Sequence, residues 1–212
     1  MFERLRKSMV EKYVINEGVV DKKVILALQR VPRHLLVDPA MRHQAYQADS
    51  LPIGFGQTIS HPTTVALMSQ LLKIEGGEKI LEIGTGSGYQ AAVLAEMGAK
   101  VYTIERIAGL GNQTRLRLEK LGYYSIAIRI GDGTLGWNEY APYDKIIVTA
   151  GAPEIPENLI AQLAEGGRMI IPVGDSDRHQ LQIIDKIEGE VVVNQENSRN
   201  FVPLVGVKGW KE

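Results

Sequence analysis

Short apolar runs alternate with helical stretches between residues 79 and 173, and this alternation constrains the fold more than any other feature of the chain. Runs this short and this apolar are typical of strands buried on both faces of a sheet. Strands separated by helices of about ten residues run parallel and are joined by right-handed crossovers. The sequence therefore predicts an α/β fold with a doubly wound, mostly parallel sheet. The predicted strands are 79–83, 100–104, 126–130, 144–149 and 168–173, and the predicted helices are 89–97, 110–121 and 156–163.

The two ends of the chain follow other patterns. The first 45 residues predict a helical extension, with Asp21 as the N-cap of a helix that ends at Pro32. Residues 46–60 are rich in Gly, Pro, Gln, Thr and Ser and predict an ordered loop, after which Pro62 opens another helix. The C-terminal part predicts antiparallel edge strands, because its first two strand-like runs are joined by a tight turn and not by a helix. These strand-like runs are 181–187, 191–193 and 201–207.

Composition excludes several classes of function. The chain of 212 residues has 24 basic and 25 acidic side chains and a formal net charge of −1, which disfavours a protein that neutralises many phosphates of a nucleic acid. It has no cysteine, and therefore no disulfide, no thiolate metal site and no cysteine nucleophile. Its first ten residues lack the apolar stretch of a signal peptide, and no run approaches the ~18 apolar residues of a membrane span. We therefore expect a cytoplasmic protein of one domain.

The glycine loop after the first predicted strand indicates a nucleotide-like ligand. Gly84, Gly86 and Gly88 lie between a strand and a helix, at the sheet edge where doubly wound folds bind such ligands. Glu105 ends the next strand, where a carboxylate can accept hydrogen bonds from both ribose hydroxyls. The spacing Gly86-x-Gly88-x-x-Ala91 also satisfies the dinucleotide fingerprint, so a nicotinamide cofactor remains an alternative. A glycine-rich turn without a ligand is a third interpretation.

Acidic residues around this loop favour a ligand with positive charge. Glu82 precedes the loop, where it would repel a pyrophosphate but would suit the ammonium and sulfonium of S-adenosylmethionine. The pattern Glu82-x-Gly84-x-Gly86-x-Gly88 resembles the first motif of S-adenosylmethionine-dependent methyltransferases. Asp132, in Gly131-Asp132-Gly133 after the third strand, could accept the exocyclic amine of adenine. The alternative for Asp132 is a local turn, which Asp-Gly favours by itself.

Motifs that the sequence lacks exclude several classes of methyl acceptor. Methylation at C5 of a pyrimidine ordinarily needs a cysteine. Methylation of a base amine usually goes with a Pro-Pro-aromatic loop, and residues 149–153 read Thr-Ala-Gly-Ala-Pro. The hydroxyls of Thr58 and Ser60, just before a helix N-terminus, could instead bind a carboxylate. The alternative for Ser60 is a simple helix cap.

These segments together resemble one family, the protein-L-isoaspartate O-methyltransferases. The stretch Gln57-Thr58-Ile59-Ser60 is specific to that family, whereas methyltransferases at large share the glycine loop. The resemblance implies methyl transfer from S-adenosylmethionine to the free α-carboxylate of an isoaspartyl residue in a damaged protein, followed by closure to a succinimide. It extends over residues 31–34, 54–60, 82–89, 131–133, 147–150, 166–174 and 201–204.

The resemblance also suggests roles for individual residues. Ser60 matches the active-site serine. The substrate is expected at Thr58 and Ser60, whose hydroxyls could hold its carboxylate, and at Thr149 and Ala150, which lie at the end of the fourth predicted strand and whose backbone could pair with an extended peptide. Residues 1–75 would form the substrate side of a single domain, and residues 76–212 its cofactor-binding core. The expected cofactor contacts are Gln57, Thr58, Ile59, Ser60, Glu82, Gly84, Gly86, Gly88, Glu105, Asp132 and Gly133.

The chemistry of this reaction needs few catalytic groups. An α-carboxyl has a pKa near ~3.5, so the acceptor is ionised at pH 7 and no general base is required. We expect no metal, because residues 175–179 fit a polar hairpin turn better than a ligand set. The expected partners are damaged proteins and peptides, without nucleic acid or membrane, and the chain is expected to be a monomer. The alternatives are a nicotinamide-dependent oxidoreductase and a non-catalytic module that binds S-adenosylmethionine.

Overall fold

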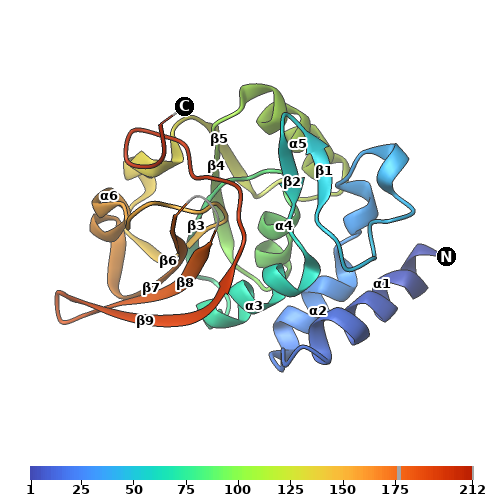
Figure 1. Ribbon diagram of the computed structural model, residues 1–212, viewed down its shortest axis with the longest axis horizontal. Coiled ribbons are helices and arrows are strands. Elements are labelled where there is room, and N and C mark those ends of the chain that lie inside the picture. Colours follow the sequence, from blue (N-terminus) through green and yellow to red (C-terminus); the bar gives the residue numbers. More distant parts are fainter. Residues whose placement is uncertain (176–177, 212) are drawn as a thin grey trace.

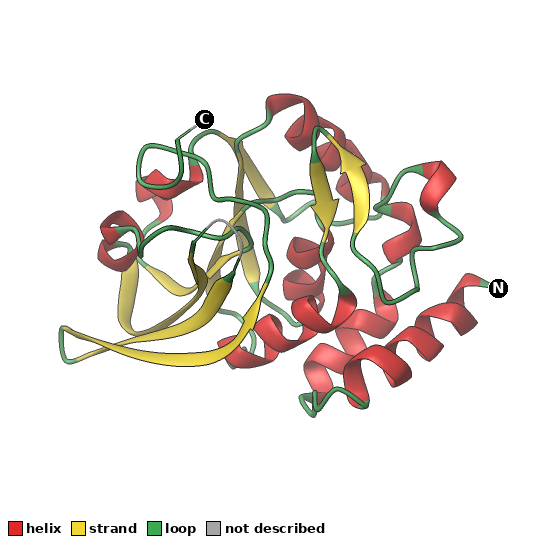
Figure 2. Cartoon of the chain, in the orientation of Figure 1, coloured by secondary structure: helices red, strands yellow, loops and turns green. Residues whose placement is uncertain are grey.

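The main sheet of the protein is mostly parallel. In the computed structural model, which describes residues 1–175 and 178–211, the main sheet has seven strands in the order β5-β4-β3-β6-β7-β8-β9, and a separate hairpin pairs β1 with β2. The strands from β5 to β7 run parallel, and β8 and β9 are antiparallel to their neighbours. Figures 1 and 2 show helices on both sides of this sheet. The predicted doubly wound α/β fold with an antiparallel C-terminal edge is therefore confirmed.

The helices and strands agree closely with the periodicity of the sequence. For example, α5 covers Ala108–Lys120 where a helix was predicted over 110–121, and β3 covers Lys79–Ile83, the bounds predicted for the first strand. The helices are α1 Phe2–Val10, the π-helical turn η1 Glu11–Ile15, α2 Lys22–Arg30, α3 Pro62–Leu72, α4 Tyr89–Glu96, α5 Ala108–Lys120 and α6 Glu157–Ala161, with short 3-10 turns η2 Arg33–Leu35, η3 Pro39–Met41, η4 Gly133–Leu135 and η5 Asn138–Tyr140. The strands are β1 Leu51–Gly54, β2 Gln57–Ile59, β3 Lys79–Ile83, β4 Lys100–Glu105, β5 Ala127–Ile130, β6 Tyr143–Val148, β7 Leu163–Gly174, β8 His179–Ile187 and β9 Glu190–Arg199.

Successive residues of the central strands point to opposite faces of the sheet, and each face has its own core. Ile80 and Ile147 pack with buried residues of the helices α2 to α5. Leu81 and Ile146 face the other way, where they pack with Trp137 and with residues from α6 and the C-terminal segment. Both faces of the sheet are therefore covered, which is why its strands read as nearly continuous apolar runs.

Two sequence predictions are wrong. Residues 46–60 are not wholly a loop, because β1 and β2 form an antiparallel hairpin within them. Buried Leu51 and Ile53 alternate with exposed Pro52, and a strand outside the interior of a sheet tolerates a proline. Residues 201–207 form no strand. Pro203 has no N–H for a ladder, and this segment makes only isolated bridges, Gly151 with Pro203 and Val205 with Trp210.

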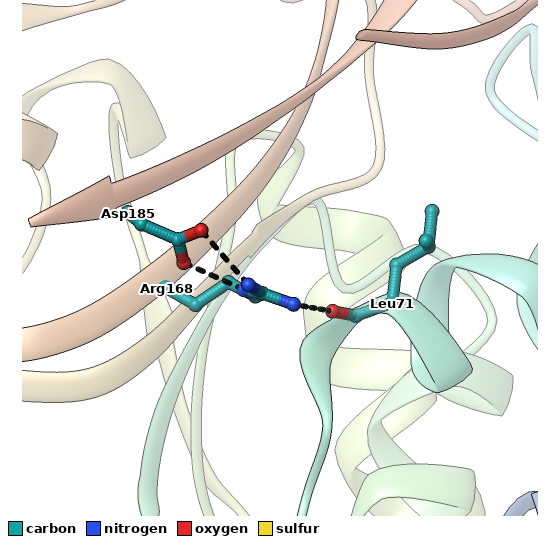
Figure 3. Close-up of polar contacts among 3 residues, drawn as sticks. All are labelled: Leu71, Arg168 and Asp185. Carbon is teal, nitrogen blue, oxygen red and sulfur yellow. Dashed lines mark hydrogen bonds and ion pairs between the residues drawn. The ribbon is translucent and has the colours of Figure 1, made fainter. Parts of the chain in front are cut away.

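A partly buried arginine joins the helix α3 to the sheet (Figure 3). Arg168 on β7 donates two hydrogen bonds to the carboxylate of Asp185 on β8, at 2.6 and 2.8 Å. Its Nη1 donates a third, at 3.0 Å, to the carbonyl of Leu71 near the end of α3. This contact satisfies an orphan carbonyl of the last helical turn and fixes α3 against the sheet.

None of the described helices combines the length and the apolar character that crossing a bilayer requires. The predicted turn at residues 175–179 connects β7 and β8, and residues 176 and 177 lie outside the described part. His179, the last residue of that predicted turn, is instead the first residue of β8 and is 2% exposed.

Candidate active site

A cavity of about 850 Å³ lies at the carboxyl edge of the sheet. The chain passes from β3 to β4 on one side and returns to β6 on the other, so β3 and β6 border the topological switch point. Doubly wound folds bind their ligands at this point. The segments that follow β3, β4 and β6 line the cavity, as do β2 and the segment that follows β9. Sequence positions far apart are thus brought to one site.

Residues 84–87 of the glycine loop line the cavity. Gly84 has a φ of 95°, and a Cβ atom there would lie 2.5 Å from the Oγ1 of Thr149. The Thr149 hydroxyl donates to the carbonyls of Ile83 and Gly84, at 3.0 and 2.8 Å. These contacts hold the loop against the end of β6, and any side chain on Gly84 would disrupt them. Both Gly84 and Gly86 line the cavity as predicted.

Gly88 packs where two helices meet, and its contact with the cofactor stays a prediction. It is the N-cap of α4 with a φ of 82°, and it is not among the residues that line the cavity. A Cβ atom at Gly88 would come within 2.8 Å of the Thr114 side chain on α5. Gly88 therefore permits the close packing of α4 and α5.

Glu105 lies at the end of β4, is 6% exposed and lines the cavity. Its two carboxylate oxygens accept hydrogen bonds from the amides of Gly86 and Ile107, each at 2.9 Å. Each oxygen of a carboxylate can accept a second hydrogen bond. The side chain is thus held in place while it keeps the capacity to bind a pair of hydroxyls.

Glu82 is buried beneath the loop and does not itself line the cavity. Within the described residues, neither of its carboxylate oxygens has a hydrogen-bond partner. Burial raises the pKa of Glu82 to about 8, the neighbouring hydroxyl of Thr103 opposes that rise, and the charge of Glu105 adds to it. The carboxyl is therefore neutral at pH 7 until a positive group comes near it.

Asp132 adopts the local turn that was its alternative interpretation. Its carboxylate accepts hydrogen bonds from the amide and the hydroxyl of Thr134, and from the amide of Val207 at 2.7 Å. Partial burial raises the pKa of Asp132, but the hydrogen bonds from Val207 and Thr134 outweigh it and leave the pKa below its usual value. Asp132 lies outside the lining of the cavity, whereas Gly133 is part of it. The contact with adenine stays a prediction.

The hydroxyl-rich segment of residues 57–60 also lines the cavity. Gln57, Thr58 and Ile59 come from β2, Ser60 follows them, and all four line the cavity. The cap of α3 is His61 and not Ser60, since the Nδ1 atom of His61 accepts a hydrogen bond from the Thr63 amide at 3.2 Å. The alternative interpretation of Ser60 as a simple helix cap is therefore wrong.

The backbone pairing with a peptide that was expected at Thr149 and Ala150 cannot use the amide of Thr149. Both residues line the cavity, but the Thr149 amide already donates to the carbonyl of Ile83 at 2.9 Å. The next residue, Gly151, exchanges hydrogen bonds with Val202 and Leu204 of the C-terminal segment. The Thr149 amide and the Gly151 backbone are thus already bonded within the chain, and the contact of a peptide with Thr149 and Ala150 stays a prediction.

Sequence reasoning missed the residues that only the tertiary fold brings to the cavity. Tyr13 and Glu17 come from the N-terminal helical region, in which no sequence feature indicated a site. Arg106 follows Glu105 directly, and its place beside a predicted ribose ligand was a usable signal. Residues 198–205 also line the cavity, and the motif 201–204 had marked part of them.

The described residues contain no group of three or more His, Cys, Asp or Glu side chains that could hold a metal ion. The polar groups around the cavity are instead carboxylates, hydroxyls and loop amides. This set suits an organic ligand with hydroxyl and cationic groups, next to a second ligand that bears a carboxylate.

Comparisons with known proteins agree with this chemistry. Residues 4–209 match the family described as protein-L-isoaspartate(D-aspartate) O-methyltransferase (PCMT). A protein-L-isoaspartate O-methyltransferase of Syntrophobacter fumaroxidans is 51% identical over 211 residues, which are 99% of this chain and 98% of the relative. One from Geobacter metallireducens is 50% identical over 99% of this chain and 97% of the relative.

Solved structures of similar proteins have the same fold. One protein-L-isoaspartate O-methyltransferase superposes with a TM-score of 0.86 at 30% identity, over 99% of this chain and 67% of that chain. A Plasmodium falciparum protein described as a beta-aspartate methyltransferase (PCMT) was solved in complex with S-adenosyl-L-homocysteine. It superposes with a TM-score of 0.83 at 26% identity, over 94% of this chain and 98% of that chain.

Proposed function

The chain belongs to the protein-L-isoaspartate(D-aspartate) O-methyltransferase family, and from this premise we propose how the residues of its cavity divide the work of the reaction. It transfers a methyl group from S-adenosylmethionine to the free α-carboxylate of L-isoaspartyl residues in damaged proteins. The ester then closes to a succinimide, which starts repair. The observation that carries our assignment is that one cavity joins the glycine loop to the Thr58 and Ser60 hydroxyls.

The residues present fit S-adenosylmethionine, which supplies a methyl group on a positively charged sulfur. Glu105 would accept both ribose hydroxyls, because its two oxygens are oriented by loop amides and retain free lone pairs. Glu82 is a buried carboxyl without a partner among the described residues, and it would become ionised beside an ammonium. Gly84, Gly86, Gly133 and the segment 57–60 would complete the contacts to this ligand.

The substrate carboxylate is held by hydroxyls. We assign Thr58 and Ser60 to this task, with Ser60 donating to the oxygen that does not attack, so that the other oxygen points at the methyl group. The α-carboxyl is already ionised at pH 7, because its pKa is near ~3.5, and no base has to remove a proton. Catalysis then rests on aligning the attacking carboxylate oxygen with the methyl group, at a distance of about 3 Å, and on excluding water from both.

His61 does not serve as a base in this scheme. Burial lowers the pKa of His61, a hydrogen bond that its ring donates to the Ala48 backbone opposes that effect, and the charges of Arg33 and Arg199 lower the pKa further. The imidazole is therefore mostly neutral at pH 7, and its Nδ1 atom is used to cap α3. We assign His61 to positioning Ser60 at the start of the helix.

We further propose that the chain acts as a cytoplasmic monomer on proteins and peptides with isoaspartate, and on no nucleic acid. The net charge of −1 supports the last point. Thr149 and Ala150 line the cavity, and we keep them as proposed contacts of the substrate.

Methyl transfer from labelled S-adenosylmethionine tests the function. The protein is incubated with two peptides of one sequence, one with isoaspartate and one with ordinary aspartate. Label should enter only the isoaspartyl peptide and should be released by mild base, as expected of a methyl ester. Equal labelling of both peptides, or of neither, would overturn the assignment.

A further inference from the structure

The strand β9 leaves an open edge on the main sheet. In the described part of the chain β9 pairs only with β8, and all its residues except Arg199 are exposed (Figures 1 and 2). An edge strand directs the N–H and C=O groups of every second residue outward. Proteins usually protect such edges with lysine, proline, a bulge or a short strand. β9 spans ten residues without lysine or proline, and its pairing with β8 is regular from Glu190 to Glu196, before an irregularity in register close to Arg199. Val191, Val192 and Val193 are 39–44% exposed on it.

This edge leads directly into the cavity. Ser198 and Arg199, the last residues of β9, line the cavity together with Asn200 and Phe201. The charge of Arg199 lowers the pKa of His61, the neighbour of Ser60, so the end of the strand lies within electrostatic reach of the acceptor side. In Figure 1, β9 runs from the protruding β8–β9 hairpin back toward the body of the protein. The open backbone of β9 is therefore continuous with the proposed carboxylate site.

Other backbone edges near the cavity are occupied or point elsewhere. The Thr149 amide is bonded to Ile83, and Gly151 is bonded to the C-terminal segment. The strand β5, at the opposite end of the sheet, leads to Gly131, whose amide is bonded to the carbonyl of Glu105 on the cofactor side. The strand β2 has three residues, and these form the wall proposed for the cofactor and the carboxylate.

We propose that β9 is the docking edge for the polypeptide substrate, in which residues on one flank of the isoaspartyl residue add to β9 as a further strand. This inference rests on the proposed function. Pairing through the backbone gives affinity without a requirement for particular side chains, which suits an enzyme that meets isoaspartate in many sequences. An isoaspartyl residue adds one carbon to the main chain and breaks the strand repeat, so it belongs where β9 ends and the cavity begins.

Peptides of different length test this docking edge. The wild-type protein is assayed with Gly-isoAsp-Gly, with a nonapeptide carrying isoaspartate at its centre, and with nonapeptides N-methylated at alternate residues of either flank. We expect the nonapeptide to have a KM about tenfold to a hundredfold below that of the tripeptide, because two or three backbone hydrogen bonds are gained. Methylation of one flank should remove this advantage and leave kcat unchanged.

Neighbouring residues of β9 supply a matched pair of variants. Asn194→Pro and Gln195→Pro each remove one amide, and because outward and inward amides alternate, one of the two variants removes an outward amide. The variant whose melting temperature equals that of the wild type is the outward one. We expect it to raise the KM for the nonapeptide about tenfold, while the KM for the tripeptide stays unchanged. The other variant loosens the hairpin and should lower the melting temperature.

Several results would overturn the docking edge. One is an equal KM for tripeptide and nonapeptide, and another is a KM advantage that survives both N-methylation and the outward proline. If the wild type sediments as a dimer and the variant that lacks an outward amide sediments as a monomer, then β9 pairs with a second copy of the chain and not with the substrate. Failure of the wild type to methylate the nonapeptide, whose flanks can pair with β9, contradicts the proposed function itself, so the two failures can be told apart.

Discussion

At the scale of single residues, Ser60 carries the chemical assignment because the helix behind it does not use its hydroxyl as a cap. His61 takes that position, and Ser60 lies one residue earlier, on the wall of the cavity. A hydroxyl that orients a charged acceptor contributes through one hydrogen bond that is strongest in the reacting geometry. Its removal should therefore affect turnover more than folding.

We expect Ser60→Ala to lower kcat for an isoaspartyl peptide about 10-fold to 100-fold at saturating S-adenosylmethionine, since one hydrogen bond to a charged group is lost. The measurement is initial-rate methyl transfer. Ser125→Ala is the matched control, because Ser125 is exposed and is not among the residues that line the cavity. Full turnover in Ser60→Ala would refute the role proposed for this hydroxyl.

Glu82 should make stability depend on pH. Its pKa is raised from 4.5 to about 8 by burial, so the folded protein binds a proton between these values that the unfolded chain has released. The free energy of unfolding must therefore fall as pH rises from about 5 to 8, on the order of 2–5 kcal/mol, and then level off. Glu82→Gln cannot ionise and should lack this part of the pH dependence.

Urea unfolding of wild type and Glu82→Gln at pH 5, 7 and 8.5 measures the difference. The variant should gain stability relative to the wild type as pH rises, because only the wild type has to bury a charge. Parallel curves for the two proteins over this range would mean that Glu82 is ionised in the folded state throughout.

At the scale of elements, the β1–β2 hairpin contributes β2 to the lining of the cavity and pairs with no other strand among the described residues. A two-stranded hairpin is marginally stable in water, so its contacts with the rest of the protein hold it in place. Phe55, in its turn, has a φ of 54° and is 50% exposed, and its ring packs so close to Gly109 that a Cβ there would lie 2.7 Å from its Cζ. Gly109 lies in the first turn of α5, and Ile53 of β1 approaches Gly86.

We expect Phe55→Ala to increase the dissociation rate of S-adenosylhomocysteine several-fold, because the hairpin loses its contact with α5. The unfolding free energy should change by less than about 1 kcal/mol, since half of the ring is already in water. Stopped-flow displacement measures the rate. Leu116→Ala removes a similarly exposed apolar side chain, 58% exposed, from α5 and should leave the rate unchanged. An unaltered rate in Phe55→Ala would show that the hairpin does not retain the ligand.

The bridge from Arg168 to Asp185 and to the Leu71 carbonyl couples α3 to the sheet. Arg168→Met should lower the free energy of unfolding by about 2–4 kcal/mol, because a partly buried carboxylate and a helix carbonyl lose their donors. The free energy of unfolding of Arg168→Lys should lie between those of the wild type and Arg168→Met, since an ammonium cannot reproduce the bidentate contact with the carboxylate. Lys7→Met, which breaks the exposed pair with Glu3, should cost less than about 1 kcal/mol in the same urea titrations. A loss in Arg168→Met no larger than in Lys7→Met would contradict this view of the bridge.

At the scale of the whole molecule, the parts of the fold that follow from local pattern were predictable. The strand β3 has the predicted bounds, because burial on both faces leaves a continuous apolar run. The hairpin β1–β2 was missed, since Pro52 and the glycines hide an alternation of few residues. The segment 201–207 reads as a strand but forms none. Its residues Val202 and Leu204 pack against the core without a neighbouring strand, and Pro203 has no N–H for a ladder.

The same distinction applies to the site. The glycine loop and the segment 57–60 were predicted, because each gathers its chemistry within a few residues of sequence. Tyr13 and Arg199 were not, since the α1–η1 region and the end of β9 reach the cavity only through tertiary packing. Asp132 was placed next to the ligand by position alone, whereas the fold uses its carboxylate to hold the C-terminal segment.

The division into residues 1–75 and 76–212 remains a prediction, and we expect both parts to unfold together. Buried residues of α2, such as Leu28, belong to the same core as Tyr89 of α4 and Ile80 of β3. The guanidinium of Arg33 also lies 4.8 Å from the Tyr89 ring. A shared core of this kind makes separate unfolding of either part costly.

Hydrogen exchange measured by mass spectrometry can follow both parts at once. Slowly exchanging amides in peptides from residues 22–30 and 79–105 should report one opening free energy, equal to that from urea unfolding. S-adenosylhomocysteine at 100 times its dissociation constant should raise this value by about 2.7 kcal/mol in both peptides. A rise confined to residues 79–105 would mean that the N-terminal region opens separately. In that case the residues it brings to the cavity, Tyr13 and Glu17, could not be held in place by the core.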